Sequence, residues 1–157
     1  MNFLTKLTYE NFEFEVDVQT NTSIYDLLAS DADMQRNDEV VDFYLSNRDK
    51  FYSSELVTFL DLAGVDLTKE NELIHYSFDS GQIGIDGWYD VVGKCSSEKT
   101  LSFWWGNDFY TTNIYFRMDA QHATREQFTN LITFRIEFAI VVEPGFSRLG
   151  DKGKEAM

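Results

Sequence analysis

The chain has 157 residues, of which 43% are hydrophobic and 16% aromatic, and its formal net charge is -14. The length is typical of one domain with a single core, and disordered acidic tails lack so many aromatic residues, so we expect the acidic groups to decorate a folded body. A surface of predominantly negative charge repels nucleic acid and anionic membranes. This repulsion argues against both as direct ligands and favours a basic protein as the partner.

Several other properties are disfavoured by simple sequence patterns. No run of 18 apolar residues is present, and the first residues lack a basic start followed by a long apolar stretch, so we expect neither a membrane span nor a signal peptide. The single Cys95 excludes an internal disulfide and is compatible with a reducing cytoplasm, in a bacterium or a phage-infected host. One Cys and two His cannot build a usual zinc site, and no nucleotide-binding motif is found, so we expect no metal and no cofactor.

The first 18 residues have the pattern of a β-hairpin. Phe12, Phe14, Val16 and Val18 alternate with acidic residues, which is the period of a half-buried strand. The dipeptide Glu10-Asn11 before them is suited to a tight turn after a first strand.

Two or three acidic helices are predicted between residues 22 and 64. Ser23 resembles the start of a capping box for the first helix. Asp38 is suited to cap the second helix and Ser53 or Ser54 the third, which Gly64 would end.

From residue 73 the apolar residues recur with a period of two. This pattern predicts strands over 74–78, 83–91, 101–105, 110–118 and 132–142, with a short helix over 124–131 before the last of them. The loops are too short for parallel crossovers. Residues 1–145 are therefore predicted to form one α+β domain, in which an antiparallel sheet of five to seven strands, built from the N-terminal hairpin and a C-terminal meander, packs against the helices. Residues 146–157 are expected to be a flexible tail.

The two histidines each precede a hydroxyl residue by two positions, in His75-Tyr76-Ser77 and His122-Ala123-Thr124. Such paired motifs resemble the signature of the 2H phosphoesterases. The resemblance implies a phosphodiesterase in which His75 and His122 act as general acid and base while Ser77 and Thr124 bind the phosphate. The residues themselves favour His75 as a solvent-side strand residue and Thr124 as a helix N-cap, so we expect that the two histidines do not share a cleft.

The acidic helical region is the strongest candidate for a partner-binding surface. Its first half contains Asp31, Asp33, Asp38, Glu39 and Asp42, with Arg36, Arg48 and Lys50 as local counter-ions. Glu55, Asp61, Asp66, Glu70 and Glu72 follow. Carboxylates on a rigid helical frame can replace the phosphates of DNA or RNA and so compete for the basic groove of a nuclease. The alternative is a solvated face that only keeps the protein soluble.

The aromatic run Phe103-Trp104-Trp105 has two interpretations. Alternation sends Trp104 to the face opposite its two neighbours. Packing of the run against the helices is favoured, and the alternative is a solvent-facing Trp104 that anchors a partner beside Trp88. A weaker hypothesis pairs these tryptophans with Asp86 and Asp90 in a glycosidase-like site.

The interpretation that best fits these patterns is a small, non-catalytic inhibitor that binds a basic, nucleic-acid-binding protein. Immunity proteins of nuclease toxins and phage anti-defence proteins that mimic DNA are the two settings that produce such chains. The alternatives are the 2H-like phosphodiesterase and a structural protein whose sheet edge pairs with a second copy of itself to form a homodimer.

Overall fold

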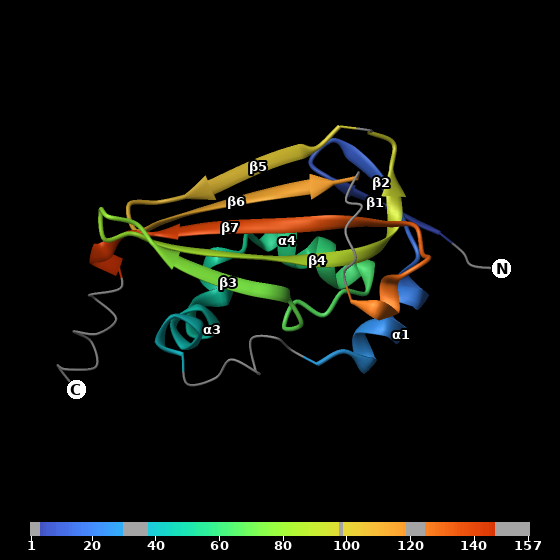
Figure 1. Cartoon of the computed structure of the whole chain (residues 1–157). Coiled ribbons are helices and arrows are strands. Elements are labelled where there is room, and N and C mark those ends of the chain that lie inside the picture. Colours follow the sequence, from blue (N-terminus) through green and yellow to red (C-terminus); the bar gives the residue numbers. More distant parts are fainter. Residues whose placement is uncertain (1–3, 30–37, 98, 119–124, 147–157) are drawn as a thin grey trace.

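The protein has an α+β fold in which an antiparallel sheet of seven strands packs against helices (Figure 1). The computed structural model describes residues 4–29, 38–97, 99–118 and 125–146. In chain order the elements are β1 Thr5–Tyr9, β2 Phe12–Val16, α1 Val18–Leu27, α3 Glu39–Phe51, α4 Ser54–Ala63, β3 Asn71–Ser77, β4 Ile83–Cys95, β5 Leu101–Gly106, β6 Tyr110–Arg117, the 3-10 turn η1 Glu126–Phe128, and β7 Thr133–Val142. The predicted fold class is therefore confirmed. None of the described helices is long and apolar enough to cross a membrane.

The sheet is organised around β4. The strand order is β1-β2-β4-β7-β6-β5, and β3 also pairs with β4. β4 is long enough for β2 to pair with residues 93–95 while β3 pairs with residues 83–88. The predicted meander is present as β5, β6 and β7, but β4 pairs with β7 rather than with β5. This order leaves β5 at one end of the sheet.

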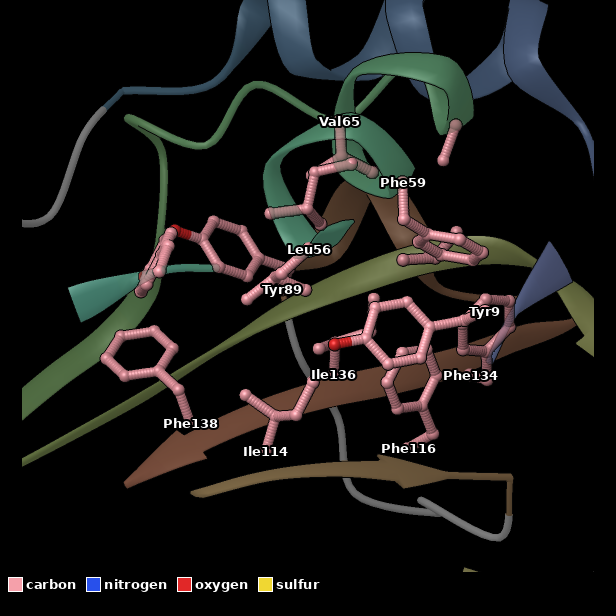
Figure 2. Close-up of a cluster of buried hydrophobic side chains, with 14 of the residues drawn as sticks. Tyr9, Leu56, Phe59, Val65, Tyr89, Ile114, Phe116, Phe134, Ile136 and Phe138 are labelled. Atoms are coloured by element: carbon pink, nitrogen blue, oxygen red, sulfur yellow. The ribbon is translucent and has the colours of Figure 1, made fainter. Parts of the chain in front are cut away.

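The core lies between the sheet and α4. Four residues of α4 are buried because they follow the spacing of one helical face, namely Leu56, Phe59, Leu60 and Ala63. Figure 2 shows Phe59 near the rings of Tyr9 and Phe116, whose centroids lie 5.8 and 5.7 Å from its own. The helix begins at the predicted cap, where Ser53 Oγ accepts a hydrogen bond from the N–H of Leu56 at 3.1 Å.

Gly64 ends α4 as predicted, in the left-handed conformation with φ 81°. A Cβ atom at this position would lie 2.6 Å from both the Val18 carbonyl oxygen and Thr22 Oγ1. Only glycine therefore meets the two requirements of this position, the backbone angle and the close approach of α1.

The first helix begins earlier than its predicted cap at Ser23. The carboxylate of Asp17 caps α1 by accepting hydrogen bonds from the N–H and the hydroxyl of Thr20 at 3.0 and 2.8 Å. Val18, predicted as a strand residue, is the first residue of the helix because the cap turns the chain directly after β2. The helix predicted over 124–131 is reduced to η1, and residue 124 lies outside the described residues.

A buried polar network connects α3 to the sheet. The hydroxyls of Tyr44, Tyr52 and Tyr89, here called the tyrosine row, lie 2.7 Å apart at each step. Tyr44 donates to the Glu70 carboxylate, which also accepts from Arg48 at 2.8 and 3.1 Å. The sequence-based prediction that Glu70 and Arg48 belong to the acidic surface is therefore wrong. Glu70 is fully buried, and Arg48 is its partner rather than a counter-ion of surface acids.

The end of the described chain packs against aromatic side chains. The ring of Phe146 lies 5.4 Å from that of Phe43 and 5.7 Å from that of Phe109. Residue 146, which was predicted to start the tail, thus contributes to packing, and the remainder of that tail, 147–157, lies outside the described residues.

Candidate functional site

The predicted partner-binding residues lie on opposite sides of the sheet. Asp38, Glu39 and Asp42 belong to the start of α3, on the side that the helices cover. Trp88 and Trp104 lie on the other side, which carries no described helix (Figure 1). We call that second side the open face, formed by Ile74, Tyr76, Asp86, Trp88, Trp104, Asn113, Tyr115, Glu137 and Ala139. Asp31 and Asp33 lie outside the described residues.

Asp38 has a structural task at the start of α3. Its Oδ1 accepts hydrogen bonds from the N–H groups of Val40 and Val41 at 2.9 and 3.2 Å, and its Oδ2 lies 2.8 Å from His75 Nε2. The bond with His75, followed by the capping bond from Val41, holds the pKa of Asp38 below its ordinary value. Asp38 is thus ionised at neutral pH, but its oxygens already have partners.

The exposed carboxylates of α3 form an acidic stripe. Glu39, Asp42 and Asp49 are exposed, and their spacing of three and seven residues places them on one side of the helix. None of the three forms an ion pair with another described residue. Two of the five acids predicted for the interface are therefore free to meet a partner.

His75 faces the helices, not the solvent side of the sheet. It pairs in register with the buried Ile85, and its side chain, 31% exposed, is bonded to Asp38. The solvent-side placement that the sequence favoured for His75 is therefore wrong. Ser77 is exposed at the end of the same strand. His122 and Thr124 lie outside the described residues, so the second half of the 2H-like motif has no described geometry.

One row across the open face has large side chains at its two ends and smaller ones between them. The register places Trp104, Asn113, Ala139, Asp86 and Ile74 in one row across β5, β6, β7, β4 and β3. Trp104 is 74% exposed and Ile74 is 51% exposed. The packing of Trp104 against the helices that the sequence favoured is therefore wrong, and only its neighbours in the run face the core.

Trp88 lies on the open face but not beside Trp104. Three pairing steps separate their strands, through β7 and β6. The guanidinium of Arg135 lies 4.3 Å from the ring centroid of Trp88, and it forms ion pairs with Asp90 at 3.7 Å and Glu137 at 3.6 Å. This cluster covers much of Trp88. Trp88 is thus less available as an anchor than Trp104.

Asp86 lies in a shallow groove of about 300 Å³ next to this cluster. Burial raises the pKa of Asp86, and the hydroxyl of Tyr76 donates to it at 3.3 Å. Asp90 is only 2% exposed and is paired with Arg135. The two carboxylates therefore differ in access, which disfavours the glycosidase-like pairing of Asp86 with Asp90.

A second groove follows the free edge of β5. It has a volume of about 470 Å³ and is lined by Tyr9, Glu10, Ser53, Glu55 and residues 102–105, including Trp104. We call it the β5 groove. The N–H of Glu10 donates to Glu55 Oε1 at 2.9 Å, and a hydrogen bond between the two carboxyl groups raises the pKa of Glu10. Two acids thus meet next to the most exposed tryptophan.

This acid pair could not be predicted from the sequence. Glu10 lies in the hairpin turn and Glu55 in the first turn of α4, and 45 residues separate them along the chain. The only local signal is the position of Glu10 at a turn, where its φ of 53° is consistent with a tight hairpin. Nothing in the sequence relates that turn to the start of α4.

No group of three or more His, Cys, Asp or Glu side chains within the described part of the chain could hold a metal ion. The chain matches no protein-family model, no curated protein and no solved structure. The functional assignment therefore rests on the surfaces of the protein itself.

Proposed function

We propose that this protein binds and inhibits a basic, nucleic-acid-binding protein by presenting carboxylates in place of nucleic-acid phosphates. An immunity protein for a nuclease toxin and a phage protein that blocks a host nuclease both fit this proposal. The partner is a protein, because the net charge of -14 would repel nucleic acid itself.

The observation that carries the proposal is the inward orientation of Arg48. The sequence contains few cations near the acids of α3, and Arg48 is one of them. Its guanidinium is bonded to the buried Glu70, so it does not neutralise the acidic stripe of Glu39, Asp42 and Asp49. The surface of α3 is therefore more negative than a count of charges along the sequence indicates, which supports attraction of a basic partner.

A binding role also agrees with the condition of the candidate catalytic groups. His75 is bonded to the helix-capping Asp38, and Asp90 is buried against Arg135. Both side chains are thus occupied by contacts that stabilise the fold. The phosphodiesterase alternative receives no specific support from the described residues.

The experiment combines capture with displacement by DNA. The tagged chain is incubated with the heparin-binding fraction of a bacterial lysate, and bound proteins are eluted with duplex DNA. We expect DNA to displace a nuclease or other nucleic-acid-binding protein, and we expect the purified chain to inhibit its DNA binding. Raising the salt concentration should weaken capture, because at about 0.15 M salt exposed charges more than roughly 8 Å apart are largely screened from each other.

Charge-reversal variants locate the contact. Glu39→Lys with Asp42→Lys should slow association, whereas the matched control, Glu13→Lys with Glu126→Lys, reverses two exposed acids outside α3 and should have a smaller effect. Capture that neither DNA nor salt reduces, or an equal effect of both double variants, would refute the proposed mimicry.

A further inference from the structure

β5 forms an edge of the sheet that lacks the usual protection. It is the last strand in the order of the sheet, so only one of its sides pairs with a described strand. Its sequence from Leu101 to Gly106 contains no charged residue and no proline, the residues that commonly block edge-to-edge pairing. Trp104 at its centre is 74% exposed. The strand thus has the features of a site where another strand can add.

The backbone of β5 presents three residues to that free side. The N–H of Asn107 donates to the carbonyl of Tyr110 at 2.9 Å, so this pair closes the hairpin between β5 and β6. Bonded and non-bonded pairs alternate along an antiparallel ladder. Counting back from Asn107 through the regular register, Ser102, Trp104 and Gly106 direct their N–H and C=O groups away from β6. An added strand could pair with all three residues.

The β5 groove gives the added strand a charge preference. Glu10 and Glu55 line the groove together with residues 102–105, and the N–H of Glu10 donates to Glu55 Oε1 at 2.9 Å, so the two acidic residues meet there. Neither acid forms an ion pair with a described Lys or Arg. A lysine or arginine side chain entering the groove would separate and neutralise the two carboxylates. A second copy of this chain, with its own acid pair and a net charge of -14, would increase the repulsion instead.

We propose that β5 receives an extended, basic segment of the partner protein as an additional strand of the sheet. The residue opposite Trp104 shares its side of the sheet and packs on the exposed indole ring. The flanking residues of the added strand point to the other side, where Glu10 and Glu55 bind their Lys or Arg side chains. The segment recognised is therefore one in which basic and apolar residues alternate. This inference depends on the proposed function in taking the partner to be basic.

The test uses a capped synthetic peptide in which arginine and valine alternate, added to the full chain and followed by amide NMR shifts. We expect shift changes confined to residues 101–106 and to the neighbourhoods of Glu10 and Glu55. The Kd should weaken about tenfold in the Glu10→Gln, Glu55→Gln double variant, which removes the charge-assisted contacts. The matched control, Glu39→Gln with Asp42→Gln, removes the same charge from α3 and should change the Kd less than about twofold.

Two peptide controls test strand pairing without changing the protein. N-methylation of the backbone amides that face β5 should abolish binding, because it removes the donors that pair with the sheet. A scrambled peptide of the same composition should bind more weakly. Binding that survives N-methylation, or that both double variants weaken equally, would refute the inference. A dimer of the free chain that Trp104→Lys dissociates would show that a second copy occupies β5 instead.

The failure of this inference is distinguishable from failure of the proposed function. If DNA-displaceable capture of a basic protein depends on Glu39 and Asp42 but not on Glu10 and Glu55, the proposed function stands and the β5 inference is wrong. If the alternating peptide binds at β5 but no captured protein is displaced by DNA, the edge binds basic strands and the mimicry proposal is wrong.

Discussion

Replacement of Glu70 should be among the most destabilising single changes in this protein. Glu70 is fully buried and accepts hydrogen bonds from Tyr44 and Arg48, whose side chain is only 12% exposed. Glu70→Leu leaves the Arg48 guanidinium buried without a counter-charge, which costs about 3–5 kcal/mol. Glu70→Gln keeps an acceptor for Arg48 and offers an amide donor to Tyr44, so only the charge-assisted part is lost, about 1.5–3 kcal/mol.

Urea denaturation followed by tryptophan fluorescence measures both losses, provided that the slope of the unfolding free energy against urea stays constant. Arg48→Met serves as the test of mechanism. Because it removes the unpaired charge, adding it to Glu70→Leu should recover part of the lost stability, since an apolar pair often replaces a buried ion pair without cost. The reasoning is wrong if Glu70→Leu costs less than about 1 kcal/mol, or if Arg48→Met adds to its cost.

Three further predictions follow from the fold. Asp38→Ala should cost about 1 kcal/mol of stability in urea denaturation, because the helix cap is lost. The pKa of Asp38 is lowered in the folded state, so its contribution to stability is present above pH 3.8 and fades as the pH falls through that lower pKa. The stabilities of wild type and variant should therefore converge in acid. Burial raises the pKa values of Tyr44, Tyr52 and Tyr89. Their contribution to stability is therefore present below pH 10 and is lost as the pH rises through the raised pKa values. Ultraviolet titration should show that these three tyrosines ionise only when the protein unfolds. Gly64→Ala should cost more than about 1 kcal/mol by thermal denaturation, because φ is positive and the methyl group meets α1, and an unchanged midpoint would contradict the close packing of α1 on α4.

Features that depend on neighbouring residues could be predicted from the sequence. The alternation of apolar residues predicted the five C-terminal strands, and Asp38, Ser53 and Gly64 were assigned correctly because a helix cap acts within three or four residues of itself. The start of α1 was missed because two caps compete there. Asp17 precedes Ser23, and its placement directly after β2 lets the helix begin six residues sooner than the apolar pattern indicates.

Features that depend on residues far apart in the sequence could not be predicted. Arg48 pairs with Glu70, 22 residues away, and Glu10 meets Glu55, 45 residues away. A count of charges treats Arg48 and Glu70 as surface groups, since burial of a charge becomes visible only when its partner is placed. For Glu10 and Glu55, which are exposed, it gives no sign that the two lie together. His75 was assigned to the solvent side for a related reason. The alternation of β3 shows which residues share a side, but not which side the helices cover.

The tyrosine row contains fewer hydroxyl protons than contacts. Tyr44 gives its proton to Glu70, and Tyr89 gives its proton to the carbonyl of Leu67. The single proton of Tyr52 must then serve two oxygens, those of Tyr44 and Tyr89, each 2.7 Å away. Rotation of one hydroxyl exchanges two arrangements of the same heavy atoms, as in the proton disorder of ice. The heavy atoms at the centre of this core thus have one arrangement, while the Tyr52 proton alternates between a hydrogen bond to Tyr44 and one to Tyr89.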